Sequence, residues 1–271
     1  MTQIEVRLNP DVTPAGSDLS IVNAARRSFN KRSDWEVKVS DSMKLLGHKN
    51  QLKEKDKRLL EFLARGMTAD DWEYFVDKVS AAGELYAFEV GAKDDLVDML
   101  WDWRNTPTHD TPFNHTFISF EVKAPIFVSR QMVKHEYLIV SEFSRRYIDD
   151  GIEFYQPDFW RKQHEDKKQG STTDKVAEYL EGYHLTSQAS LDYFNELISM
   201  GVAIEQARMV LPLSTMTEWT WSGTLGAFAK MCTLRLAPDA QYETRLVAEK
   251  VYDYLCDYYP IAAPALVKGP R

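Results

Sequence analysis

Cysteine is scarce in this chain of 271 residues, which contains only Cys232 and Cys256, and their spacing matches no metal-binding pattern. We therefore expect no metal site and a reducing, cytoplasmic setting. Long apolar runs are lacking as well, because none approaches the ~20 residues that a transmembrane helix needs. The N-terminal residues show no signal-peptide pattern. The sequence thus predicts a protein with no membrane segment.

An excess of basic residues is also missing, since the net charge at pH 7 is −8. A general nucleic-acid binding role is therefore not expected, because it requires a basic face. A few clustered arginines can still bind a small anion locally. Apolar residues make up 44% of the chain, which is enough for a core and predicts a folded single domain over residues 1–271.

The most polar feature of the sequence is the stretch 129–147, SRQMVKHEYLIVSEFSRRY, which follows the apolar run 124–128. Core-forming residues followed directly by many donors and charges suggest a site on a rigid element. The structural alternative is a solvated helix end. Pro125 is suited to the first helical position. We expect that helix to end near Glu136, because the β-branched run that follows favours an extended segment to Tyr147.

The remaining elements are predicted from periodicity and from turn signals. Strands are expected over 4–8, 116–122 and 215–221, with a turn at 111–115, an irregular charged segment at 30–57 and a polar loop at 163–173. Helices are expected over 18–29 (capped by Ser17 or Asp18), 59–63, 174–200 and 224–233, in a pair at 68–106, and in a last helix capped by Asp239 that ends before Pro260. Strands mixed with long helices point to an α+β or α/β fold.

Three blocks of the sequence carry a resemblance. The first is Arg130-Gln131 with Lys134-His135-Glu136, then seven residues and Ser144, with Glu142 and Arg146-Tyr147 in step; the second is QARMVLP at 206–212; the third is LRLA at 234–237 with AQYE at 240–243. In this order they resemble the flavin-dependent thymidylate synthases, whose signature is Arg-His-Arg, seven residues, Ser. Three ordered blocks are far more specific than one motif. The resemblance runs, with gaps, from about 18 to 258. It implies an α+β fold of that family, with a mixed sheet, long helices and assembly as a homotetramer. The helical pair near 68–106 would be an extra insertion in that fold.

Adding a one-carbon unit at C5 of a pyrimidine requires more electron density at that carbon. A cysteine attacking C6 is one route, but the Met-Cys-Thr helical setting of Cys232 suits a buried hydrophobe better. The other route polarises the base, because an arginine facing the ring stabilises the negative charge that develops there. The resemblance gives this role to Arg235.

The resemblance also implies two sets of binding residues. The nucleotide would be held by Gln131, Lys134, Glu142, Ser144, Arg145, Arg146, Arg208 and Arg235, of which Glu142, Ser144 and Arg235 would take part in catalysis. FAD would be contacted by Ser28, His109, Thr111, Lys134, His135, Glu136, Glu142, Thr224 and Lys230. Structural alternatives stay open for some of these residues: Arg208 could pair with Glu205, Ser144 could cap a turn, and His109 could be structural.

The departures from the family pattern fall on the cofactor side. The two triplet arginines are Lys134 and Glu136, the family's Asn-Ala-Arg is Thr224-Leu225-Gly226, and a following Asn is Lys230. Lysine loses the bidentate geometry of arginine, and glutamate reverses the charge. The nucleotide half of the site thus looks retained and the flavin half rewritten.

Two reactions and one non-enzymatic role fit this pattern. The first is conversion of dUMP to dTMP with methylenetetrahydrofolate as carbon donor, reduced FAD as hydride source and NADPH as reductant. The second is hydroxymethylation of dUMP or dCMP, in which water attacks the methylene and no net reductant is consumed; this reaction would suit a virus with modified DNA bases, acting in the host cytoplasm. The third is a non-catalytic homologue that binds nucleotide. The expected partners are a pyrimidine deoxynucleoside monophosphate and a folate, with no nucleic acid and no membrane.

Overall fold

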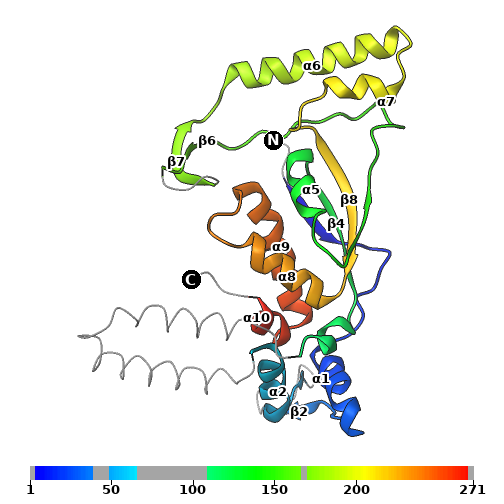
Figure 1. Ribbon diagram of the computed structural model, residues 1–271, viewed down its shortest axis with the longest axis vertical. Helices are drawn as coiled ribbons and strands as arrows, with labels where there is room; N and C mark the ends of the chain where they lie inside the picture. The colour runs from blue at the N-terminus through cyan, green and yellow to red at the C-terminus, as the bar shows by residue number, and fades with distance from the viewer. Residues whose placement is uncertain (1–3, 39–48, 66–108, 166–169, 268–271) are drawn as a thin grey trace, which may run out of the picture.

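The computed structural model describes residues 4–38, 49–65, 109–165 and 170–267. The predicted insertion near 68–106 lies outside the described residues. The described elements combine an antiparallel sheet with several helices (Figure 1), so the α+β class is confirmed.

The main sheet has the strand order β1-β4-β8-β5. Its strands are β1 (Glu5–Leu8), β4 (Ile118–Pro125), β8 (Met216–Gly223) and β5 (Leu138–Glu142). The predicted strands at 4–8, 116–122 and 215–221 are therefore confirmed. The expectation of a mixed sheet is wrong for the described strands, whose pairings are all antiparallel. β4 and β5 run in the same direction, but they do not pair with each other. β8 lies between them and pairs antiparallel with both.

One face of this sheet packs against helices (Figure 1). These are α5 (Ile126–Met132), α8 (Leu225–Arg235) and α9 (Tyr242–Tyr258), and α10 (Ala262–Leu266) packs against α8 and α9. Phe228 of α8 makes edge-to-face contacts with Phe120 and Trp221, at centroid distances of 5.1 and 5.2 Å. Cys232 is fully buried beside them, and burial raises the pKa of its thiol. The prediction that Cys232 is a buried hydrophobe is confirmed.

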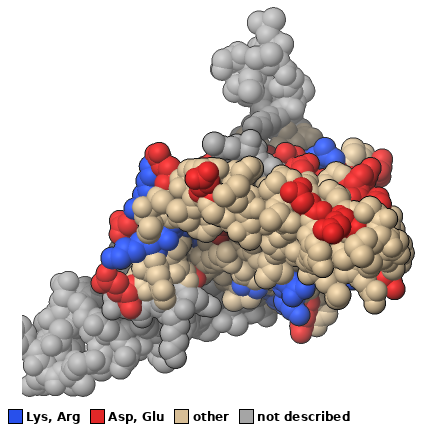
Figure 2. Space-filling view, turned by 90° about the horizontal axis from the view of Figure 1, so that it is seen from above, with Lys and Arg blue, Asp and Glu red and all other residues tan. Residues whose placement is uncertain are grey.

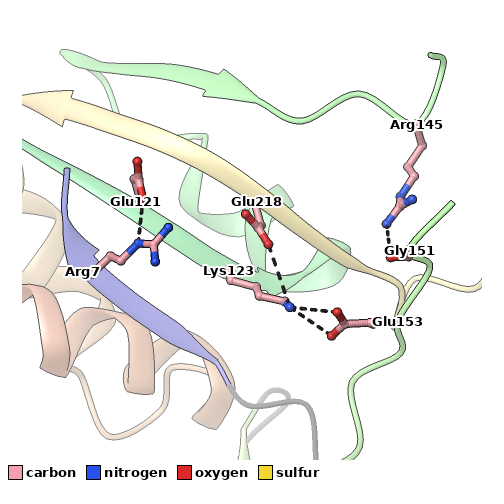
Figure 3. Close-up of polar contacts among 7 residues, drawn as sticks. All are labelled: Arg7, Glu121, Lys123, Arg145, Gly151, Glu153 and Glu218. Atoms are coloured by element: carbon pink, nitrogen blue, oxygen red, sulfur yellow. Dashed lines mark hydrogen bonds and ion pairs between the residues drawn. The ribbon is translucent and has the colours of Figure 1, made fainter. Parts of the chain in front are cut away.

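The other face of the sheet carries charged side chains that pair with one another (Figure 3). Arg7 bonds Glu121 at 2.7 Å, and Lys123 lies 3.0 Å from Glu153 and 3.9 Å from Glu218. Side chains alternate between the faces of a strand. β4 and β8 therefore place their aromatic residues under the helices and their charges on the open side.

The N-terminal part begins with α1 (Asp18–Arg26), where Ser17 forms the capping box, so the predicted cap is confirmed. A short 3₁₀ helix η1 (Arg27–Phe29), a hairpin of β2 (Glu36–Lys38) and β3 (Lys49–Gln51), and α2 (Glu54–Arg65) follow. The expectation of an irregular segment at 30–57 is therefore wrong in part. Its polar residues take part in folding, because the buried Asp56 pairs with Arg26 and accepts a hydrogen bond from Ser33.

Several predicted boundaries shift. β6 (Trp160–Gln163) pairs with β7 (Ser171–Ala177), so the helix expected from 174 begins only as α6 (Glu181–Ser199). Pro125 is the N-cap of α5, which ends at Met132 before the expected 136. Gln241 takes the N-cap position of α9 that was expected at Asp239, and α10 follows Pro260. The remaining short elements are η3 (Thr111–Asn114), α7 (Ile204–Ala207) and η4 (Arg208–Val210).

α6 and α7 stand at one end of the molecule, away from the sheet-covering helices (Figure 1). Viewed from that end, the surface is mostly uncharged and carries separate patches of acidic and of basic residues (Figure 2). Within the described residues, no helix combines the length and apolar character needed to cross a bilayer.

Candidate functional site

Arg235, the last residue of α8, lies against the C-terminal end of α5. Its Nε donates a hydrogen bond to Nε2 of His135 at 2.9 Å, and one Nη donates to the main-chain oxygen of Gln131 at 3.0 Å. Partial burial lowers the pKa of Arg235, and the guanidinium stays charged because its ordinary pKa is above 12. Two sequence blocks separated by about a hundred residues therefore meet in one contact.

His135 is neutral in this contact. Burial, and then the charge of Arg235, lower the pKa of its imidazole to about 4. A neutral imidazole has one nitrogen lone pair, and Nε2 uses it to accept from Arg235. His135 thus fixes the guanidinium without competing with it for an anion.

The Gln131 side chain is held by α9. Its amide nitrogen donates to Oε1 of Gln241 at 2.5 Å and to the Phe127 main-chain oxygen at 3.3 Å, and its amide oxygen accepts from Oγ1 of Thr244 at 3.3 Å. These partners settle which end of the amide is the donor. The sequence analysis gave no role to Thr244 and quoted Gln241 only as part of a block.

Glu142 ends β5 and accepts hydrogen bonds from two hydroxyls. Oγ of Ser129 lies 3.2 Å from its Oε1, and Oγ1 of Thr217 lies 2.9 Å from the same atom. The carboxylate is therefore oriented by α5 and β8, while its residue is exposed. The sequence carried no signal for Ser129 or Thr217, because single hydroxyl residues in a helix and a strand have many ordinary uses.

The loop after β5 brings three predicted nucleotide contacts together. Arg145 donates to the main-chain oxygen of Gly151 at 2.9 Å and stacks over Phe143 at 4.7 Å, and burial lowers its pKa. Oγ of Ser144 accepts from N and Nε of Arg146, at 3.4 and 3.3 Å. Ser144 therefore makes the turn-capping contact that was its structural alternative. A cavity of about 320 Å³ opens beside this loop, with Lys123, Phe143 and Arg145 in its lining.

Thr224 and Lys230 bring α8 close to η3, which contains Thr111. Oγ1 of Thr224 accepts from N of Ala227 at 3.2 Å as the N-cap and donates to Oδ1 of Asn114 at 2.8 Å. Lys230 lies 3.6 Å from Asp110 and 6.0 Å from the ring centre of Tyr137. No role was predicted from the sequence for Asp110, Asn114 or Tyr137.

Gly226 allows the close approach of η3 to α8. A Cβ on Gly226 would lie 2.5 Å from Oδ1 of Asn114, so a larger side chain would displace the Asn114 amide. The position where the family pattern has an arginine is therefore filled here by Asn114.

The other predicted site residues are exposed. Lys134 and Glu136 flank His135 and are exposed; Ser28 is exposed, with Oγ 3.3 Å from the Ala25 oxygen; and His109 is exposed, with its main-chain N 3.1 Å from the Leu63 oxygen. Arg208 is exposed in η4, and its Nε donates to the main-chain oxygen of Glu205 at 3.3 Å. This is a main-chain contact, and no salt bridge between Arg208 and Glu205 is present in the described structure.

Comparison with solved structures supports the fold. A UMP/dUMP methylase from Streptomyces cacaoi, solved with 5-Br dUMP, superposes with a TM-score of 0.64 at 22% identity, covering 97% of this chain and 94% of that one. The same methylase bound with 5-Br UMP gives a TM-score of 0.63. The chain therefore has the fold of that methylase.

The family follows from sequence comparison. The Thy1 family, described as thymidylate synthase complementing protein, matches residues 11–261. A flavin-dependent thymidylate synthase of Thermus thermophilus is 38% identical over 170 residues, which are 62% of this chain and 61% of that protein; one of Thermosipho africanus is 35% identical over 167 residues, 59% of this chain and 72% of that protein. The chain belongs to the Thy1 family, and its match spans about three fifths of the Thermus relative's length.

The residues present fit a flavin. Tyr137 presents a ring that is 78% exposed, with the backbone held at φ +64°, and such strained positions cluster at ligand sites. An exposed aromatic ring offers a stacking surface for a flat heterocycle. Lys230 lies beside this ring, with its ammonium group 3.6 Å from the Asp110 carboxylate.

Proposed function

We propose that the protein transfers a one-carbon unit from methylenetetrahydrofolate to C5 of a pyrimidine deoxynucleoside monophosphate, and that the reaction converts dUMP to dTMP. The observation that carries this proposal is the contact of Arg235 with His135 and Gln131, in a chain of the Thy1 family. Flavin-dependent thymidylate synthases among the relatives support it.

In this proposal Arg235 polarises the base. Two of its N–H groups are used by His135 and by the Gln131 oxygen, and arginine has five, so others are available to a ligand. A fixed guanidinium beside a pyrimidine stabilises negative charge on the ring without reorganising during the reaction. The neutral imidazole keeps the positive charge of Arg235 undiminished.

Arg145, Arg146 and Arg208 are the proposed phosphate partners. Arg208 belongs to η4, which lies beside α6, whereas Arg145 follows β5. We infer that the working enzyme is a homotetramer in which Arg208 of one copy completes the site of another. The exposed apolar side chains of α6, such as Leu185 and Tyr193, support this inference, because apolar patches commonly mark contacts between proteins.

His135, Thr111, Thr224, Lys134 and Lys230 are the residues that would hold FAD, with Ser28, His109, Glu136 and Glu142 as further candidates. When bound and reduced, FAD supplies the hydride that turns the transferred methylene into a methyl group, and NADPH restores the reduced state. The chain's own contribution is to bind and orient. Glu142, fixed by two hydroxyls, ends β5 directly before the loop that carries Arg145 and Arg146.

The test is the mass of the product. The protein is incubated with methylenetetrahydrofolate and dUMP, with and without NADPH. Thymidylate synthesis should give a nucleotide heavier by one methylene group and only with the reductant. The Arg235→Lys variant, which keeps the charge and loses the planar fork, should lose most of the activity. An unmodified nucleotide with every donor and reductant combination would contradict the proposal.

Hydroxymethylation of dCMP or dUMP is the second candidate. The exposed Lys134 and Glu136, together with Asn114 in place of an arginine side chain at Gly226, favour it because they alter the flavin side. Its product would be heavier by a methylene group plus an oxygen and would form without NADPH. A carboxylate at Glu136 could also accept from the amino group of cytosine, so dCMP should then bind more tightly than dUMP, and Glu136→Gln should narrow the difference.

A further inference from the structure

A buried ion pair joins the two-stranded β6–β7 sheet to the first turn of α9, and no role proposed above uses it. Arg161 of β6 donates from Nη2 to Oε1 of Glu243, and the two side chains are only 14% and 5% exposed. Burial of both charges costs desolvation energy that offsets much of their attraction. The pair therefore does more to fix the direction of the Glu243 carboxylate than to stabilise the fold.

Arg161 is held in place from several sides. Its Nε donates to Oγ of Ser171 on β7 at 2.9 Å, and its guanidinium lies over the Tyr242 ring, 4.3 Å from the ring centre. Directly before β7 the chain also approaches the loop that precedes α9, because a Cβ on Gly170 (φ +94°) would lie 3.3 Å from the main-chain oxygen of Asp239. A guanidinium restrained in this way presents its donors in one direction.

The second oxygen of Glu243 begins a chain of hydrogen bonds that ends on Gln131. Oε2 of Glu243 accepts from Nε2 of Gln241 at 3.1 Å, and Oε1 of Gln241 accepts from Nε2 of Gln131 at 2.5 Å. An ionised carboxylate can only accept, so it draws the amide nitrogen of Gln241 toward itself and turns the amide oxygen toward Gln131. The direction of both bonds is therefore set by the charge on Glu243.

Gln131 is the point at which this chain of bonds reaches the proposed nucleotide site. Its main-chain oxygen accepts from Arg235 at 3.0 Å, and its amide oxygen accepts from Oγ1 of Thr244 at 3.3 Å. Its amide nitrogen donates to the main-chain oxygen of Phe127 at 3.3 Å as well as to Gln241. Turning the amide over would place its oxygen against these two acceptors, so one orientation alone satisfies the bonds.

We propose that Arg161 is a positioning residue for the nucleotide site, acting through the bonds described above to hold the Gln131 side chain in one orientation. The inference rests on the proposed function, in which Gln131 binds a pyrimidine nucleotide. Two residues, Glu243 and Gln241, separate Arg161 from Gln131. A ligand-binding side chain that loses its supporting bonds keeps its place in the chain but not its direction, so its affinity for the ligand falls.

The test is a double-mutant cycle on dUMP binding, measured by titration calorimetry. Arg161→Gln removes the cation that orients Glu243 and should weaken dUMP binding about tenfold. In a Gln131→Ala background the same substitution should have no further effect on dUMP affinity, because the amide that Arg161 orients is gone. Arg161→Lys keeps a cation beside Glu243 and should retain most of the affinity.

Two further variants separate positioning from folding. Arg161→Gln/Glu243→Gln leaves no unpaired buried charge, and it should weaken dUMP binding as Arg161→Gln does, because an amide can donate as well as accept and no longer directs Gln241. Arg26→Gln is the matched control, since it leaves the fully buried Asp56 without its arginine; it should lower stability without changing dUMP affinity. Circular dichroism checks that each variant is folded.

Equal dUMP affinity in the folded Arg161→Gln/Glu243→Gln variant and the unmodified protein would overturn the proposal. An equal loss with and without the Gln131 side chain would also overturn it, because Arg161 would then act by another route. Neither result touches the proposed function, which depends on the product formed by the unmodified protein. A protein that binds dUMP but forms no product loses the proposed reaction and keeps this role of Arg161. A protein that binds neither dUMP nor dCMP loses both.

Discussion

α8 and α6 differ sharply in how much of each helix the chain itself covers. Seven of the eleven residues of α8 are buried, whereas only two of the nineteen residues of α6, Ser187 and Phe194, are buried against the described chain. α8 also has a side-chain N-cap at Thr224, while Leu180 at the same position of α6 makes no capping bond. The described chain thus covers most of α8 and leaves most of α6 uncovered.

The same difference separates the two halves of the proposed nucleotide site. Arg235 at the end of α8 is fixed by His135 and by Gln131. Arg208, beside α6, bonds only a neighbouring main-chain oxygen among the described contacts and is exposed. In the proposed site, the half around Arg235 is thus preorganised within one chain, whereas the exposure of Arg208 is what we expect of a residue that completes the site of another copy. This reasoning leads to four predictions, taken from the largest effect to the smallest.

Truncation of the α8 core should cost the most. Phe228→Ala removes a fully buried ring that contacts Phe120 and Trp221, and it should lower the free energy of unfolding by about 3–5 kcal/mol. Leu185→Ala on α6, where the side chain is 58% exposed, is the comparison. Urea unfolding is measured at several protein concentrations. The Phe228→Ala loss should stay constant, while the Leu185→Ala loss should shrink on dilution, because it would act through subunit contacts that are lost in both proteins at low concentration. A large Leu185→Ala loss at every concentration would mean that α6 packs within its own chain.

Arg208→Ala should weaken nucleotide binding by about 1.5–3 kcal/mol, the range for a charge-assisted bond. Its own subunit should fold normally, because its only described side-chain bond is to the Glu205 oxygen. Binding of dUMP is measured by titration, with Arg58→Ala as an exposed control on α2. If the inferred assembly is right, a mixture of Arg208→Ala and Arg235→Lys chains should regain activity, since some sites would combine two unmodified residues. Unchanged dUMP affinity would remove Arg208 from the site.

The strands of the main sheet and some of the helix starts within one chain were predicted from the sequence. The Phe, Ile and Val content of β4 and the alternation in β8 identified these strands, and Ser17 was one of two residues expected to cap α1. The three sequence blocks assigned Gln131, His135 and Arg235 to one site before their contact was visible. The sequence-based prediction failed where residues distant in the sequence determine the local conformation. Residues 174–177 fit the apolar stripe of a helix, but pairing with β6 makes them a strand. Asn114, which belongs to η3, occupies the space beside Gly226 of α8 where the family pattern has an arginine side chain. Tyr137 adopts a positive φ, which is unusual for tyrosine and could not be predicted from its residue type.

Lowering the pH should reduce the free energy of unfolding through protonation of His135, which contacts Arg235. Its pKa in the folded chain is about 4, below the ordinary 6.5, because of burial and the Arg235 charge. Between these values the unfolded chain binds a proton that the folded chain does not, so the free energy of unfolding falls as the pH falls from 6.5 to 4. The full shift corresponds to about 3 kcal/mol, and partial exposure reduces our expectation to about 1–2 kcal/mol.

This pH dependence is measured by urea unfolding at intervals across the window. His135→Gln is the matched variant, because glutamine does not titrate and its amide oxygen can accept from Arg235. The unmodified protein should lose about 1–2 kcal/mol more than His135→Gln on going from pH 6.5 to 4. Parallel pH profiles would show that His135 does not report the environment described here.

The smallest expected effect concerns the starts of the two helices. Thr224→Ala removes a hydroxyl that accepts from N of Ala227 and donates to Asn114, and it should destabilise the protein by about 1 kcal/mol. Thr224→Ser keeps the hydroxyl and should be near neutral. Leu180→Asp supplies the cap that α6 lacks and should stabilise that helix by about 0.5–1 kcal/mol. Thermal unfolding at fixed protein concentration compares the three variants. The sign of the stability change in Leu180→Asp is decisive, because the new cap can stabilise the protein only if the Leu180 side chain makes no important contact of its own. If Leu180→Asp instead destabilises the protein and shifts it to smaller assemblies, its half-exposed side chain belongs to the subunit contact, and α6 begins within that interface.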